Sequence, residues 1–310
     1  MTILHIKLFG GFHVRDVAAA ADVKVTPNLQ HLLAYLLLFR HRAYARDVLM
    51  ELFWGDHDEA HARACLNTAL WRLRGLLEPP GRVEKGHFLL TTAAGEVSFN
   101  AGGGCLIDVA EFERLVAPPL RRPAAALRAA DAEQLEAGLA LYGGDLLEGV
   151  YADWALRERE RFREMYLTAL YHLMNYYAAQ SSFGDALRCG RLILLSDPLR
   201  EHIHRDLMRL YAANGQRSQA IQQYHTCAEV LRAELGLAPM RETQLLYQQL
   251  LLEGDDGRAA AGPAAAAGPG AAAGPGADNV DQAVQELFTL FGAVQQQFNH
   301  VLQLLDHARR

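Results

Sequence analysis

Seven side chains between positions 57 and 78 are of the types that contact nucleic acid. When the stretch is drawn as a helix, one face carries His61, Asn67, Thr68, Trp71 and Arg72, with Arg63 and Arg74 at its shoulder. Arginine can bond guanine O6 and N7, asparagine and threonine can bond base edges, and arginine also neutralises phosphate. An amphipathic surface helix with a basic face would show the same pattern, so the stretch alone leaves both interpretations open.

The other side of this stretch is apolar. Leu66, Leu70, Leu73 and Leu77 recur at spacings of four, three and four, which is the repeat of one helical face. Asp58 is a candidate N-cap, and the Pro-Pro-Gly sequence at 79–81 ends the pattern. We therefore predict one helix over about 57–78, packed through its leucines.

The elements on either side must position this helix. Residues 3–14 alternate in polarity, break at Gly10-Gly11 and continue to Arg15, and 23–25 is a third β-like piece, so we predict a small antiparallel sheet. Helices are expected over 27–41 and 46–54. After the central helix, 88–92 and 96–99 flank Gly95 and predict a β-hairpin.

Sheet, three helices and hairpin, in this order, are typical of a winged helix, in which the third helix enters the major groove. In that arrangement Thr91 and Thr92 of the hairpin, with Arg63 and Arg74, are placed for phosphate. Trp71 can pack against a thymine methyl or a sugar, or against the hairpin. A generic α+β domain remains the alternative interpretation.

Charge and composition narrow the function classes. The 310 residues carry a net charge of −6; positions 1–100 hold 11 Lys+Arg against 10 Asp+Glu, and the rest hold 19 against 26. The four cysteines are far apart, the histidines are scattered, and no phosphate-binding loop or catalytic constellation is visible. We expect a soluble cytoplasmic protein that is not an enzyme, with no metal, cofactor or membrane association.

Several stretches resemble a known family. LLAYLLL, RDVLMELFW, ARACLNTALWRLRGLL and FLLTTAAGEVSFN look like the winged-helix half of SARP-type bacterial regulators, whose DNA-binding part is similar to the OmpR/PhoB response-regulator domain. Residues 71–74 match the family motif within the recognition helix. Trp71 departs from it, because a small polar residue is common at this position.

The second half resembles the bacterial transcriptional activator domain (BTAD) that follows the winged helix in this family. The matching segments are IDVAEFE at 107–113, YGGDLLEG at 142–149, Trp154, the charged run 157–161, and LMRLYAANGQRSQAIQQYHTCAEVLRAELGLAPMRET from 207. Glycines 102–104 form the expected hinge, and 124–141 is expected to be a helix. For the charged run we favour a solvated helix face with internal Glu–Arg pairs.

An internal repeat lies within this second half. Leu173, Tyr177 and Ala186 recur 34 positions later as Leu207, Tyr211 and Ala220. A period of 34 with small residues at helix crossings indicates tetratricopeptide (TPR) repeats.

The C-terminal part has two further segments. Residues 255–278 are almost entirely Gly, Ala and Pro, which predicts a flexible tether. An apolar seam with heptad spacing follows, formed by Val280, Val284, Leu287, Phe291, Val294, Phe298, Val301 and Leu305. Self-association as a coiled coil is the favoured interpretation, and docking onto the chain's own TPR groove is the alternative.

These observations predict a mainly α protein in four parts. They are a winged-helix DNA-binding domain (1–104), a BTAD/TPR-like domain (105–254), a linker (255–278) and a coiled-coil helix (279–310). The resemblance implies a transcriptional activator that binds promoter repeats of double-stranded DNA as a homo-oligomer and contacts RNA polymerase. The TPR groove is a candidate site for a small-molecule or protein effector. A TPR scaffold or sensor, whose winged helix serves protein contacts, is the alternative function.

Overall fold

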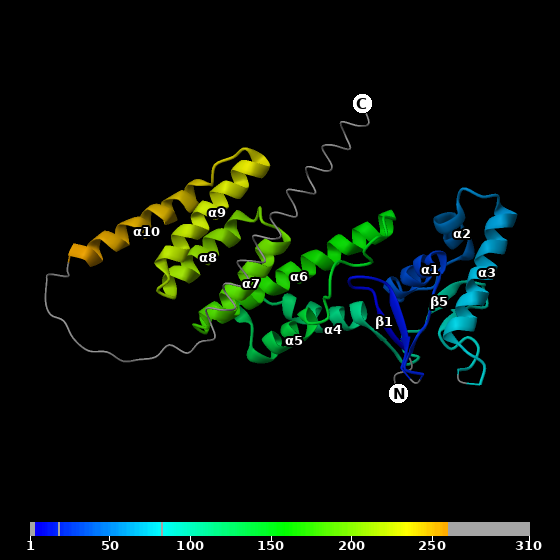
Figure 1. The fold of residues 1–310 in the computed structure, drawn as a ribbon. Coiled ribbons are helices and arrows are strands. Elements are labelled where there is room, and N and C mark those ends of the chain that lie inside the picture. Colours follow the sequence, from blue (N-terminus) through cyan, green and yellow to red (C-terminus); the bar gives the residue numbers. More distant parts are fainter. Residues whose placement is uncertain (1–3, 18, 82, 260–310) are drawn as a thin grey trace, which may run out of the picture. The chain divides into compact units, whose positions relative to one another are not determined.

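The computed structural model describes residues 4–17, 19–81 and 83–259 (Figure 1). The chain divides into two compact units, Met1–Asp256 and Gly257–Arg310. The described part is mainly helical, with a small sheet and a hairpin in its N-terminal third, as the predicted fold class requires. The last described helix, α10 (Arg241–Ala259), extends into the segment predicted as a tether. The remainder of that tether and the heptad seam lie outside the described residues.

A four-stranded sheet opens the fold. Its strands are β1 (Leu4–Lys7), β2 (His13–Asp16), β3 (Ala21–Asp22) and β6 (Cys105–Ile107), in the order β3-β2-β1-β6. β1 pairs antiparallel with β2 and parallel with β6, so that Ile6 lies between Val14 and Ile107.

The predicted sheet was wrong in two respects. The third strand lies at 21–22 rather than 23–25, and the segment after the predicted glycine hinge supplies a parallel edge strand. A strand of three residues is too short to show a period of two, and parallel pairing needs a long connection that no local pattern reveals.

Three helices follow the first strands: α1 (Pro27–Leu38), α2 (Arg46–Trp54) and α3 (Glu59–Leu77). Pro27 occupies the first turn of α1, where its missing N–H costs no hydrogen bond. The leucines of α1 and of the inner face of α3 join one continuous core. The predicted helices are confirmed, with ends shifted by at most three residues.

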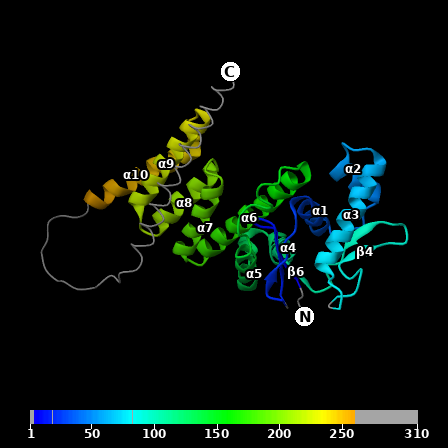
Figure 2. The same cartoon turned by 45° about the vertical axis from the view of Figure 1, so that its right-hand side comes forward.

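The hairpin consists of β4 (Leu89–Thr91) and β5 (Val97–Phe99), which lie alongside α3 (Figure 2). Gly95, in the connecting turn, has a φ of +82°, a conformation that glycine adopts without strain. Tyr44, between α1 and α2, exchanges two backbone hydrogen bonds of 2.8 Å with Val97. The hairpin is thereby fixed to the helices.

The rest of the described chain is helical. Its elements are α4 (Asp108–Leu120), the 3-10 turn η1 (Ala124–Ala126), α5 (Ala129–Leu139), α6 (Asp153–Ala179), α7 (Phe183–Ser196), α8 (Glu201–Ala213), α9 (Arg217–Leu235) and α10. The single helix predicted over 124–141 was wrong. The Asp131 carboxylate accepts the Arg128 N–H and begins a separate helix there.

The pairs α6–α7 and α8–α9 correspond to the two predicted repeats. Leu173 and Leu207 are buried on the first helix of each pair, and Ala186 and Ala220 on the second. Gly190 lets α7 and α8 approach, because a Cβ there would lie 2.6 Å from Cδ2 of Leu207.

The sheet and the helical part share one core. The buried Asp108 carboxylate, at the start of α4, accepts the backbone N–H of Leu8 at 2.8 Å and that of Phe9 at 2.9 Å. The Leu147 N–H donates to the Leu8 carbonyl at 2.8 Å. The residues after β1 are therefore held by groups about one hundred positions or more away.

A second junction is aromatic. Trp154, at the start of α6, lies against Tyr35 of α1 and Phe53 of α2, with ring centroids 5.4 and 6.5 Å away. Arg159, also on α6, donates to the carbonyls of Leu146, Leu147 and Val150. This arginine is part-buried and structural, so the expected solvated face of the charged run was wrong at this position.

Candidate nucleic-acid interface

Helix α3 presents one face to the core and one to solvent. The Asp58 side chain accepts the His61 N–H at 3.0 Å and caps the helix, as predicted. The buried positions are Ala62, Leu66, Ala69, Leu70, Leu73 and Leu77. The opposite face therefore carries the residues that the sequence selected.

The middle of the solvent face has an unusual composition. Trp71 is 74% exposed, and Ala60, Ala64 and Gly75 are exposed along the same line of the helix. We call these four residues the outer line. One large indole therefore projects from a ridge of otherwise small residues.

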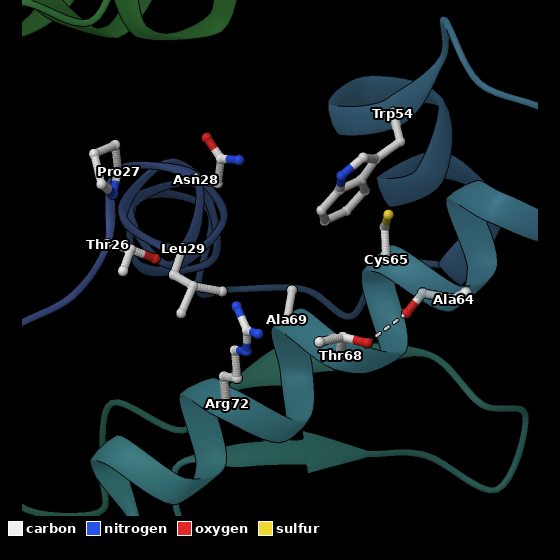
Figure 3. Close-up of a pocket in the computed structure, with 10 residues that line it drawn as sticks. All are labelled: Thr26, Pro27, Asn28, Leu29, Trp54, Ala64, Cys65, Thr68, Ala69 and Arg72. Carbon is white, nitrogen blue, oxygen red and sulfur yellow. Dashed lines mark hydrogen bonds between the residues drawn. The ribbon is translucent and has the colours of Figure 1, made fainter.

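Arg72 borders a groove between α3 and the start of α1 (Figure 3). The groove has a volume of about 540 Å³, and Thr26, Asn28, Trp54 and Thr68 also line it. Figure 3 shows the Arg72 guanidinium directed toward the α1 side. It forms no hydrogen bond or ion pair within the part of the chain that the structure describes, so its five donors are available to a ligand.

Three other predicted contact residues have intramolecular partners. The Arg46 guanidinium, from α2, donates to Oδ1 of Asn67, and Arg63 forms an exposed ion pair of 2.6 Å with Glu59. The Thr68 hydroxyl donates to the Ala64 carbonyl at 2.9 Å. These bonds occupy the Asn67 carbonyl oxygen and the Thr68 hydroxyl hydrogen within the protein.

Arg74 connects the helix with the hairpin. Its Nη2 donates to the Leu89 carbonyl at 3.3 Å and to the Thr91 hydroxyl at 2.7 Å. Thr92, in the turn, accepts the Glu96 N–H at 3.1 Å. The structure thus brings the predicted helix and hairpin residues onto one surface, and Arg74 and Thr91 contact each other within it.

Glu78 is a site residue that the sequence analysis missed. Its buried carboxylate accepts the backbone N–H of Phe88 and Leu89 through Oε1 and that of Gly86 through Oε2. A carboxylate at a helix C-terminus faces the negative end of the dipole, and this unfavourable position was the available signal. Glu78 fixes the hairpin to the end of α3.

His61 also lies on this surface, with its ring centroid 4.7 Å from that of His57. Within residues 4–17, 19–81 and 83–259, no group of three metal-binding side chains occurs. None of the described helices is long and apolar enough to span a membrane.

Comparison with known proteins finds a family model that the helical half matches. Residues 107–251 match the family model of the bacterial transcriptional activator domain. The matched segment makes up just under half of the chain. It begins one residue before α4 and ends within α10, so it contains both predicted repeats.

Two regulators are similar over most of this chain. Regulatory protein AfsR of Streptomyces coelicolor is 26% identical over 226 residues, covering 73% of this chain. Transcriptional regulatory protein MoaR1 of Mycobacterium tuberculosis is 27% identical over 253 residues, covering 76% of this chain and 77% of MoaR1. The chain spans only 22% of that AfsR and 24% of AfsR from Streptomyces griseus.

A solved structure shares the fold. Mycobacterium tuberculosis EmbR, in complex with a low-affinity phosphopeptide, aligns with a TM-score of 0.66 and 21% identity. The alignment covers 82% of this chain and 66% of EmbR. With the activator domain and the two regulators, it confirms the predicted resemblance to SARP-type transcriptional regulators.

Proposed function

We propose that this chain regulates transcription by binding duplex DNA through α3 and the hairpin. The observation that carries the proposal is the solvent face of α3, which exposes Trp71 and the unpaired Arg72 beside a hairpin fixed by Arg74. A helix that is exposed along its whole length can enter a major groove, which is about 12 Å wide. The regulatory names of the relatives point to the same function.

Within this interface each residue has a proposed role. Arg72 reads guanine through two hydrogen bonds, and Asn67 and Thr68 contact neighbouring base edges. Arg63, His61, Thr91 and Thr92 lie at the borders of the surface and contact the phosphates. Because Arg74 already bonds Thr91, we assign it to holding the hairpin at the backbone.

We further propose that the protein acts as an oligomeric activator. One winged helix contacts few base pairs. Dimerisation through the seam from Val280 to Leu305 would supply a second DNA-binding domain. The family resemblance implies direct promoter repeats and contact with RNA polymerase. An effector in the TPR groove would regulate this assembly.

The DNA-binding proposal is tested by fluorescence anisotropy. Labelled duplexes from the promoter region upstream of the protein's own gene are titrated with the full chain between about 50 and about 200 mM salt. We expect an affinity that falls steeply with salt, and tighter binding to at least one duplex than to a scrambled duplex. If no duplex binds in a salt-dependent way, the scaffold or sensor function takes its place.

The oligomer is tested separately by light scattering. Deletion of residues 279–310 should convert the full chain to a smaller species and should weaken binding to a two-site duplex more than to a one-site duplex. An unchanged particle mass would refute self-association through this segment and would favour docking onto the TPR groove.

A further inference from the structure

Trp71 occupies a position that the fold does not require it to fill. Its side chain is 74% exposed, whereas Trp54 and Trp154 are packed against the hydrophobic core. The indole is therefore available to a partner, and it lies on a surface that already carries nucleic-acid-binding residue types.

Gly75, one turn after Trp71, gives a second observation. A Cβ at this position would meet no atom of the protein within 4 Å, so close packing does not explain the glycine. Glycine is also a poor helix former in a helix interior. With Ala60 and Ala64 it places small residues along the outer line on both sides of Trp71, so a partner can reach the indole without meeting other large side chains of this line.

The polar groups beside the outer line are partly committed within the protein. The Thr68 hydroxyl donates to the Ala64 carbonyl, and the Asn67 carbonyl oxygen accepts from Arg46. The apolar groups along the outer line are the Trp71 indole and the Ala60 and Ala64 methyls, beside the exposed Asn67 side chain. Such a surface is complementary to apolar groups on the partner.

Thymine has the one apolar group on the major-groove edge of the four bases, its C5-methyl. We propose that Trp71 is a specificity-determining residue that packs against thymine methyl groups and so selects thymine over cytosine at the centre of the site. This inference rests on the proposed function, and it adds the identity of a base to it. Arg72 contacts polar base atoms and Trp71 contacts methyl groups in the same major groove of the DNA.

The test begins with the full chain and a library of randomised duplexes. The wild-type protein is used to select bound sequences, and each thymine of the selected site is then replaced by deoxyuridine, which removes only the methyl group. Loss of one buried methyl should weaken wild-type binding about fourfold at the position that Trp71 contacts. Replacing that thymine by 5-methylcytosine should be tolerated better than replacing it by cytosine.

Two variants complete the test. Trp71→Ala should bind the thymine and deoxyuridine sites equally, and Trp71→Phe should keep part of the discrimination. Tyr151→Ala is the matched control, because Tyr151 is a similarly exposed aromatic residue (78%) on the loop before α6. It should discriminate as the wild type does. Circular dichroism verifies that each variant is folded.

The outcomes separate this inference from the function on which it rests. Selection of a defined site with no deoxyuridine effect, or with equal effects on wild type and Trp71→Ala, overturns the role of Trp71 and leaves DNA binding intact. Failure to select any sequence, with no salt-dependent affinity, overturns the proposed function itself.

Discussion

At the scale of single residues, the sequence predicted which side chains of α3 are exposed better than it predicted which of them have hydrogen-bond partners within the protein. The sequence selected seven candidates on α3, and the structure places them on the exposed face or at its edge. The sequence could not reveal that Asn67 and Arg74 have intramolecular partners, because those partners come from α2 and from the hairpin. The Glu59–Arg63 pair, at i,i+4 spacing on one helix, could have been predicted. Arg72 and Trp71 are thereby distinguished from the rest.

Arg72→Ala should weaken binding to the selected site by about 1–3 kcal/mol, because two hydrogen bonds to guanine are lost. Anisotropy on the selected site and on random DNA measures the difference. Arg232→Ala, an exposed arginine on α9, is the control and should bind both duplexes as the wild type does. An equal loss on both duplexes would reassign Arg72 to a phosphate contact.

His204 gives a prediction about pH. Its buried ring bonds the Pro198 carbonyl through Nε2 and the Gln223 amide through Nδ1, and burial lowers the pKa of His204 below 6.5. The imidazole of His204 therefore binds a proton more readily in the unfolded chain than in the folded protein, so stability is lost as pH falls below about 6.5. The free energy of unfolding in urea, measured between about pH 7.5 and about pH 5, should change less with pH for His204→Gln than for wild type. An equal change with pH in both proteins would contradict this prediction.

At the scale of elements, the periodic helices were predictable and the short or interrupted elements were not. The four leucines of α3 repeat at helical spacing and remain buried, so sequence and structure agree on its inner face. β6 has three residues, and η1 separates from α5 at Arg128, where a side-chain cap decides the boundary. Local patterns carry little information about either feature.

The crossing of α7 and α8 gives a test of packing within the helical half. Gly190→Ala should lower the unfolding free energy by about 1–3 kcal/mol, because its methyl would crowd Leu207 and Met174. Gly184→Ala, in the same helix, is the matched control, because no atom lies within 4 Å of its added Cβ. The control should be neutral or stabilising by up to about 1 kcal/mol. Equal effects in urea unfolding would argue against a tight crossing.

At the scale of the whole molecule, the predicted division into domains 1–104 and 105–254 is less complete than the sequence suggested. The predicted boundary after residue 104 separates β6 from its partner β1, and it separates Asp108 from the backbone it caps. Trp154 lies between α1 and α2 from the helical side. Long-range pairing of this kind leaves no trace in composition or spacing.

A fragment of residues 1–104 should therefore fail to fold cooperatively, because it loses an edge strand and the groups that satisfy Leu8 and Phe9. A fragment of residues 1–256 keeps all of these contacts and should melt in one transition. Thermal melts followed by circular dichroism measure both. A cooperative melt of the shorter fragment would show that residues 1–104 fold independently of the rest of the chain.

Trp154→Ala tests the aromatic junction in the full chain. Removal of the indole from its contacts with Tyr35 and Phe53 should cost about 3–5 kcal/mol of unfolding free energy. Trp71→Ala, which removes an exposed indole, should change stability by less than about 0.5 kcal/mol. If Trp154→Ala lowers the unfolding free energy in urea as little as Trp71→Ala does, Trp154 does not join the two parts.

The pairing of β1 with β6 also has a consequence for the order of events during synthesis. β1 is translated early, but the carboxylate that accepts the Leu8 N–H lies 100 positions later. Until that part of the chain leaves the ribosome, one edge of β1 has no partner, and the four-stranded sheet is incomplete. A chain released before this point would contain the whole of α3 but would lack β6 and Asp108, so the N-terminal part can complete its fold only after translation has passed residue 108.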